Sequence, residues 1–228
     1  MEERPLPQAP APSPAPGARP PWLARALALA LVAGAIGLVT STYGALSQTW
    51  DEPAHIGCGM EWLDRGTFTL EPLTPPLARV AAALGPWLAG GHSHGIDDVW
   101  LEGNAILGSG AHYVRTLALA RAGMLPFLLL GAWVVWAWAR RRAGGAAALA
   151  ALALFLTLPP VLGHAGLAAT DFPLAATFAA ALYAFTRWLE EPGAGRAALA
   201  GGAAALATLA KFSALPFLAL SLPLVALA

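Results

Sequence analysis

The feature that most constrains this chain is a run of twenty-five uncharged residues, Ala26 to Trp50, followed directly by two carboxylates, Asp51 and Glu52. About 20 consecutive apolar residues are enough to cross the hydrocarbon of a bilayer. The acidic pair is therefore expected where a membrane helix reaches the surface. Carboxylates at such a boundary can face water on one side and low-dielectric protein on the other, a setting in which their pKa values are easily tuned.

The composition places the whole chain in the same class. Hydrophobic residues make up 57% of it and charged residues 11%, which excludes an ordinary soluble domain. The net charge is zero and no basic cluster is interleaved with aromatic residues, which argues against nucleic acid as a partner. Cys58 is the only cysteine, so an intramolecular disulfide and a cysteine-based zinc site are both excluded.

The chain divides into a short tail and a membrane module. Residues 1–21 are dominated by Pro and Ala and predict a disordered cytoplasmic tail. Residues 22–228 predict an all-α, polytopic transmembrane helix bundle of five or six spans. The spans are expected at about 22–43, 116–139, 143–159, 172–189 and 197–213, with a sixth that begins near 216. Because the last span is cut short at residue 228, we expect a fragment of a longer protein.

The distribution of charge predicts the orientation of the module. Eight of the thirteen cations, including the cluster Arg140 to Arg142, fall on the side that the positive-inside rule assigns to the cytoplasm. Residues 45–114 form a long exoplasmic loop that holds eight of the thirteen acidic residues. Two short helices are expected in this loop, at 53–64 and 75–89, the second lying along the membrane surface. The expected location is the plasma (inner) membrane, multi-pass, with the N-terminus cytoplasmic.

Several polar residues are candidates for chemistry on the exoplasmic side. Asp51 and Asp171 each have an alternative role as a helix N-cap with proline in the first turn. Lys211 is the only lysine and lies in an apolar run, which favours an anionic lipid phosphate as its partner, with snorkelling to the interface as the alternative. All five histidines also fall on this side: His55, His92, His94, His112 and His164.

A divalent metal is a possible cofactor, and no other cofactor is indicated. The string HSHGIDD, residues 92–98, places two histidines and two aspartates at a spacing that could bind such an ion. The surrounding glycines favour a solvated loop instead.

Five stretches together resemble one family of membrane enzymes. They are WDEPAHIGCGMEWLDRG, TPPLAR, VRTLALARAG, HAGLAATDFPLAATFAAALYAFTRWLE and ATLAKFSALPFLAL. Their order and spacing are similar to those of the membrane glycosyltransferases of superfamily C (the GT-C fold), in the family of protein O-mannosyltransferases and lipid A aminoarabinose transferases. The resemblance covers nearly all of the chain after residue 21.

This resemblance implies transfer of a sugar from a polyprenyl-phosphate donor to a lipid, glycan or protein acceptor on the exoplasmic side of the membrane. Asp51 would be the catalytic base and Glu52 a neighbouring pocket carboxylate. The resemblance implies that Arg79, Arg115 and Lys211 face the lipid phosphate. From their position on the exoplasmic side, His164 and Asp171 are further candidate substrate-binding residues. Two other functions stay open: a non-catalytic or truncated lipid-binding module, and a transporter. A transporter is less favoured because the spans carry few ionisable groups near their centres.

Overall fold

A computed structural model describes residues 21–108 and 110–227, and this part of the chain is helical without any β-strand. The predicted all-α class is thereby confirmed, whereas nearly all of the predicted tail lies outside the described residues. The helices are α1 (Pro21–Ser41), α2 (Glu52–Arg65), α3 (Pro76–Leu88), α4 (Val99–Leu107), α5 (Gly110–Ala122), α6 (Leu125–Thr157), α7 (Pro159–Ala165), α8 (Asp171–Glu190), α9 (Ala194–Ala210) and α10 (Ala214–Leu227).

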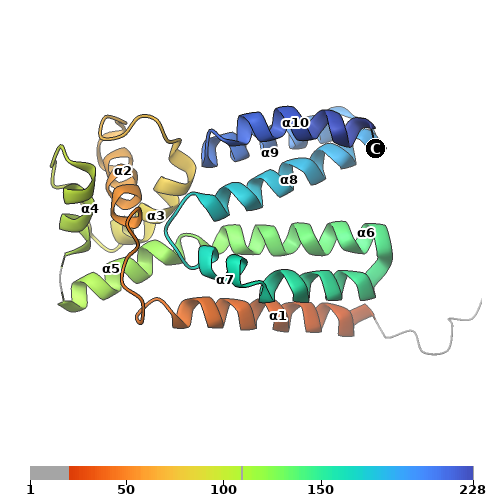
Figure 1. Cartoon of the computed structure of the whole chain (residues 1–228), viewed down its shortest axis with the longest axis horizontal. Helices are drawn as coiled ribbons and strands as arrows, with labels where there is room; N and C mark the ends of the chain where they lie inside the picture. Colours follow the sequence, from red (N-terminus) through yellow and green to blue (C-terminus); the bar gives the residue numbers. More distant parts are fainter. Residues whose placement is uncertain (1–20, 109, 228) are drawn as a thin grey trace, which may run out of the picture.

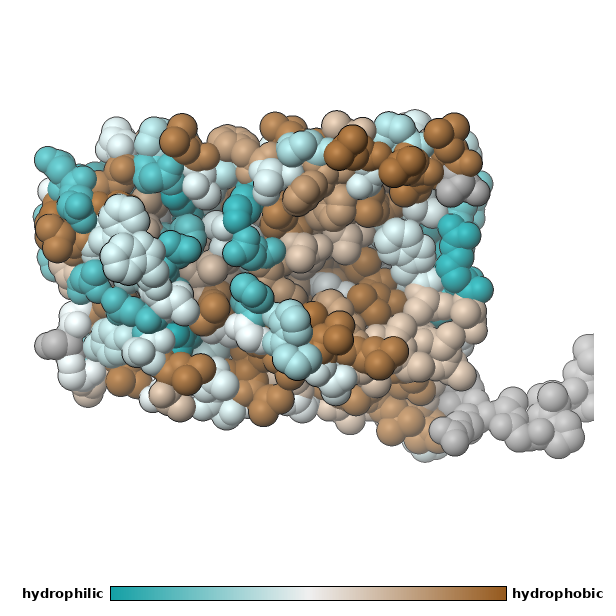
Figure 2. Space-filling view, viewed as in Figure 1, coloured by the Kyte–Doolittle hydropathy of each residue, from teal (hydrophilic) through white to brown (hydrophobic). Residues whose placement is uncertain are grey.

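The helices form two regions (Figure 1). Helices α1, α6, α8, α9 and α10 lie side by side, and we call them the rods. Helices α2 to α5 gather at the end of the rods where α1 stops, and we call them the end block. In the space-filling view, hydrophobic residues dominate the middle of the rods and hydrophilic residues gather in the end block and at the far end of the rods (Figure 2).

A single glycine divides the longest rod. Gly144 has φ 81° and ψ −176°, a conformation that glycine adopts far more readily than other residues. The two limbs of α6 on either side of it run antiparallel (Figure 1). The predicted boundary between two spans just after the arginine cluster therefore coincides with a sharp reversal of the chain. We call this far end of the rods the Gly144 end.

Two described segments are long and apolar enough to cross a membrane, judged by length and composition. They are Trp22–Ser41, within α1, and Gly110–Thr157, which includes α5 and both limbs of α6. Helices α9 and α10 are apolar but shorter. The helical conformation is interrupted between Ala210 and Ala214, near the boundary that the sequence predicts.

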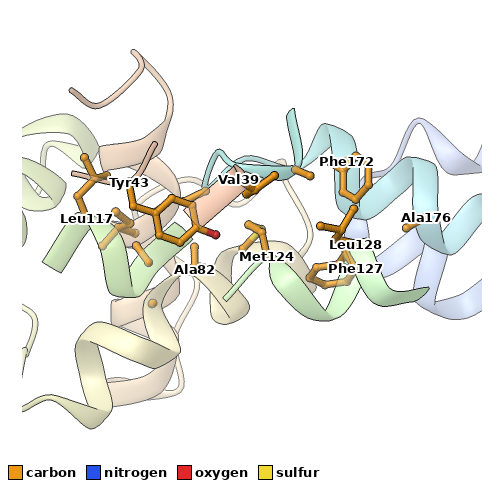
Figure 3. Packing of buried hydrophobic residues seen from close by; sticks show 14 of the residues in the cluster. Val39, Tyr43, Ala82, Leu117, Met124, Phe127, Leu128, Phe172 and Ala176 are labelled. Carbon is orange, nitrogen blue, oxygen red and sulfur yellow. The ribbon is translucent and has the colours of Figure 1, made fainter. Parts of the chain in front are cut away.

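One apolar core joins the rods to the end block. Val39, Met124, Leu128 and Phe172 are buried in it, and it continues to Leu117 in the end block (Figure 3). Because the core is continuous, the end block has a fixed place over the ends of the rods.

The end block packs through close backbone crossings. A Cβ at Gly59 of α2 would lie 2.0 Å from the carbonyl oxygen of Arg79 in α3. A Cβ at Gly103 of α4 would lie 1.9 Å from the carbonyl oxygen of Pro53 in α2.

The two predicted loop helices are present as α2 and α3. Helix α4 was not predicted, and the helix expected to begin at residue 116 begins at Gly110.

Candidate functional site

Glu52, at the start of α2, is fully buried, and both its oxygens are occupied by the protein. Arg121 of α5 donates to the two oxygens from Nε at 2.8 Å and from Nη2 at 2.9 Å. The backbone N–H groups of Ala168 and Thr49 donate at 2.9 Å and 2.8 Å. Burial alone would raise the pKa of Glu52, but these hydrogen bonds outweigh it and hold the pKa below its usual value.

These contacts give Glu52 a structural role, whereas the resemblance implies a carboxylate that faces the substrate pocket. Its carboxylate connects the start of α2 to α5 and to the loop before α8. Arg121 also donates to the carbonyl oxygens of Leu46 and Ser47, each at 2.9 Å, so the chain leaving α1 is held by the same pair. An acceptor hydroxyl would find no free oxygen on Glu52.

Asp51, the preceding residue, is exposed. It occupies the N-cap position of α2, but its backbone is helical, with φ −86° and ψ −20°, and its side chain makes no capping hydrogen bond. The alternative role of Asp51 as a side-chain cap is therefore not seen. Its carboxylate is available to solvent and to a ligand.

His55 lies one helical turn after Asp51, and its backbone N–H donates to the carbonyl oxygen of Asp51 at 3.0 Å. Its Nδ1 is buried and has no hydrogen-bond partner among the described residues. Burial lowers the pKa of His55 to about 4, and the positive charge of Arg79 and that of Lys211 act in the same direction. Asp51 and Asp171 oppose this shift. The imidazole is therefore neutral at physiological pH and has an unused nitrogen.

Lys211 and Asp171 meet at the ends of two rods. Lys211 follows the last residue of α9, and its Nζ lies 2.5 Å from Oδ1 of Asp171, the first residue of α8. The two side chains are 37% and 58% exposed. The partner seen for Lys211 is thus a carboxylate of the same chain, and Lys211 lies at a helix end.

Asp171 also lies at one end of an apolar groove between α8 and α10. The groove has a volume of about 430 Å³ and is lined by Leu174, Phe178, Phe217 and Leu220. The rings of Phe178 and Phe217 pack edge to face with their centroids 6.0 Å apart. The polar residues at the end of α8 therefore continue into an apolar surface.

Arg79 of α3 is buried and has its partners within its own part of the end block. Its side chain is 3% exposed and is ion-paired with the carboxylate of Glu71. Its Nη1 donates to the carbonyl oxygens of Glu71 and Thr74 at 2.7 Å and 3.2 Å. The predicted direct contact with a phosphate is not available in this arrangement, although the charge of Arg79 still acts on His55.

Two further predicted site residues are exposed on other helices. Arg115 is exposed on α5 and lines a cavity of about 90 Å³ with Pro86 and Gly91, at the opposite end of α3 from Arg79. His164 is exposed near the end of the short helix α7. Arg115 therefore lines a cavity that does not include Asp51, although the resemblance implies that both face the substrate.

The residues of HSHGIDD stabilise their own loop. Asp98 caps α4 by accepting from the N–H groups of Trp100 and Leu101 at 3.0 Å and 2.8 Å. His92 contacts Asp64 through its Nδ1, at 3.0 Å. Among residues 21–108 and 110–227, no group of three or more His, Cys, Asp or Glu side chains is placed to hold a metal ion.

The structure thus pairs Lys211 with Asp171 and holds the loop before α8 against Glu52, which is adjacent to Asp51. The charges of Asp51, Asp171, Lys211 and Arg79 all act on His55. His55 was not predicted as a site residue, although its spacing of four from Asp51 places the two on one helix face. Comparison with protein families, with curated proteins and with solved structures gives no match for this chain.

Proposed function

We propose that the chain belongs to a membrane glycosyltransferase of superfamily C that moves a sugar from a polyprenyl-phosphate carrier to an acceptor hydroxyl. The observation that carries this proposal is that three distant stretches meet at one end of the rods. Lys211 is ion-paired with Asp171, and the N–H of Ala168, three residues before Asp171, donates to Glu52 beside Asp51. WDEPAHIG supplies Asp51 and His55, TDFPL supplies Asp171, and AKFS supplies Lys211; the charges of all three act on the imidazole. These are the stretches on which the family resemblance rests.

In this proposal the rods are the membrane spans and the end block is exoplasmic. Six apolar segments would cross the bilayer: α1, the two limbs of α6, α8, α9 and α10. Support comes from the hydrophobic middle of the molecule between two polar ends (Figure 2). The Gly144 end carries the arginine cluster and would face the cytoplasm.

Asp51 would act as the general base. The acceptor hydroxyl attacks the anomeric carbon and gives its proton to the Asp51 carboxylate, which requires an approach of about 3 Å. A new bond forms between the acceptor oxygen and the anomeric carbon, and the bond from that carbon to the phosphate oxygen breaks. The polyprenyl phosphate leaves with the electron pair, and its added negative charge is stabilised by Lys211.

Two features support a lipid-linked donor. Lys211 can exchange one anion for another, because its present partner Asp171 is more than half exposed and a phosphate carries the same sign of charge. The groove between α8 and α10 begins at Asp171 and offers about 430 Å³ of apolar space for the start of a prenyl chain. These features also suit the second candidate function, a lipid-binding module without catalysis.

The transfer of sugar by an Asp51→Asn variant of the whole protein separates the two candidates. We expect turnover with a polyprenyl-phosphate sugar to fall by a factor on the order of 10² or more, because asparagine cannot accept the proton. Donor binding should persist, since the substitution keeps the shape and removes no capping bond. Asp97→Asn, at another exposed carboxylate of the end block, is the matched control and should leave both unchanged.

Lys211→Met tests the phosphate contact in the same assay. We expect weaker donor binding, because the substitution removes the charge and keeps an apolar side chain. If Asp51→Asn retains full turnover while Lys211→Met still loses donor binding, the catalytic proposal fails and the lipid-binding module is correct. If neither variant changes binding or turnover, both candidates are wrong.

A further inference from the structure

A second groove lies on the opposite half of the molecule, between α1 and the two limbs of α6. Its volume is about 440 Å³. Apolar residues line most of it, among them Val32 and Trp136, and two arginines, Arg25 and Arg140, also line it. Arg25 lies near the start of α1 and Arg140 near the end of the first limb of α6, so both arginines belong to the Gly144 end.

These two arginines differ from their neighbours in their partners. Four other arginines at the Gly144 end are ion-paired with Glu190 or Glu191: Arg141, Arg142, Arg187 and Arg196. Within the described residues, Arg25 and Arg140 have no acidic partner, and both are exposed. The cations that line the groove are therefore the ones whose charge no described carboxylate neutralises.

A neighbouring groove provides an internal comparison. It lies between α6, α8 and α9, has a volume of about 310 Å³ and is also lined by two arginines, Arg187 and Arg196. Both of these are paired with Glu191. Two apolar grooves thus end at the same side of the molecule. Of these two, the groove beside α1 carries the arginines that have no carboxylate partner in the described part of the chain.

We propose that the groove between α1 and α6 binds one anionic phospholipid of the leaflet at the Gly144 end. Arg25 and Arg140 would contact its phosphate, and one acyl chain would lie along Val32 and Trp136. The two helices that form the groove contain the segments long and apolar enough to cross a membrane, so its apolar surface faces lipid. Basic pockets between such helices attract anionic headgroups. A zwitterionic headgroup has no net charge and fits such a pocket less well. This site is separate from the proposed donor site, which lies at the other end of the rods.

Lipid binding to the detergent-solubilised whole chain, counted by native mass spectrometry, tests the proposal. The probes are phosphatidylglycerol and phosphatidylcholine with identical acyl chains. We expect one phosphatidylglycerol to bind preferentially. We expect Arg25→Gln/Arg140→Gln to weaken its binding about 30-fold, because each arginine near a headgroup contributes about fivefold. Arg25→Lys/Arg140→Lys keeps the charge and should retain most of the preference.

The matched control is Arg141→Gln/Arg142→Gln, which removes the same charge from the adjacent, ion-paired positions. It should leave phosphatidylglycerol binding nearly unchanged. An equal loss of phosphatidylglycerol binding in this control and in Arg25→Gln/Arg140→Gln would overturn the proposal, because binding would then depend on the total positive charge at that end and not on a specific site. The wild-type chain alone gives a further test: equal binding of the two lipids would also overturn it.

Fluorescence quenching locates the lipid. Dibrominated phosphatidylglycerol should quench tryptophan emission more than dibrominated phosphatidylcholine, and the difference should decrease in Trp136→Phe, because Trp136 lines this groove and not the comparison groove. An undiminished difference in this variant would place the anionic lipid elsewhere and contradict the proposal.

Discussion

The two ends of the rods use their charges differently. In the end block, the carboxylates of Glu52, Glu61 and Glu102 are buried, and each accepts several hydrogen bonds from the chain around it. At the Gly144 end, Glu190 and Glu191 form exposed ion pairs with arginines. Buried charges need complete sets of partners, whereas exposed pairs contribute little to stability. The end block is therefore held in one geometry by its carboxylates, and the Gly144 end is not.

The same contrast separates two adjacent residues. Glu52 is buried and used entirely in holding α2, α5 and the loop before α8 together. Asp51 is exposed beside His55. Under the proposed function, the geometry that Glu52 fixes would present Asp51 to the acceptor. Four predictions test this difference between the two ends and between the two carboxylates.

The largest expected effect is all-or-none labelling of the two ends from opposite sides of the membrane. Cys58 cannot serve for this purpose because it is 1% exposed. In a Cys58→Ala background, Asp97→Cys should react in intact cells with a membrane-impermeant thiol reagent, and Ala146→Cys only in inverted vesicles, because Ala146 lies at the Gly144 end. The reverse pattern would show that the end block is cytoplasmic.

The next effect is a large loss of stability from breaking the buried ion pair. Arg121→Met leaves Glu52 buried without its charged partner, and we expect the free energy of unfolding to fall by about 3–5 kcal/mol. Glu190→Gln, in the exposed pairs, should cause no measurable loss. Thermal unfolding of both variants in the same detergent makes the measurement. Similar small shifts in the two variants would mean that the end block is not organised by Glu52.

A smaller effect is expected from pH, through His55. Its pKa is about 4 in the folded protein and 6.5 ordinarily, so between these values the unfolded chain binds more protons than the folded chain. The free energy of unfolding should therefore fall as the pH drops from about 6.5 to about 4, by up to about 3 kcal/mol. Below the usual pKa of Glu52, protonation of that carboxylate adds a further loss.

His55→Gln isolates this contribution. It should remove most of the loss of stability between pH 6.5 and pH 4 and leave the loss at lower pH that comes from carboxylates whose pKa the fold lowers, such as Glu52, Glu61 and Glu102. Unfolding curves recorded across this range test the expectation. A variant that keeps the full slope would show that His55 is not held neutral by its surroundings.

Much of the helix pattern can be predicted from the sequence because strong local signals mark it. The uncharged run after Arg25 predicts α1, and glycine after the arginine cluster marks the break in α6 at Gly144. The break before Pro216 separates α9 from α10. Helix α4 has nine residues and no clear periodicity, so it lacks such a signal.

Which polar residues hold the fold together and which remain exposed could not be predicted, because this depends on contacts between distant segments. Nothing local distinguishes Glu52 from Asp51; the difference comes from Arg121, which lies 69 residues later. A lone arginine near the start of a predicted span needs a partner, and that was the available signal. Similarly, Arg79 and Arg115 both belong to short motifs, yet Arg79 lies near the start of α3 and Arg115, on α5, lies beside the other end of α3.

The most direct test compares Asp51→Asn with Glu52→Gln in one preparation, measuring both thermal unfolding and sugar transfer from a polyprenyl-phosphate donor. Asp51→Asn should unfold at the wild-type temperature and lose turnover, because its carboxylate holds no helix in place. Glu52→Gln should unfold at a clearly lower temperature, because Arg121 is left buried without an anion. If Asp51→Asn keeps its turnover, or is destabilised as much as Glu52→Gln, the proposed separation of structural and catalytic carboxylates is wrong.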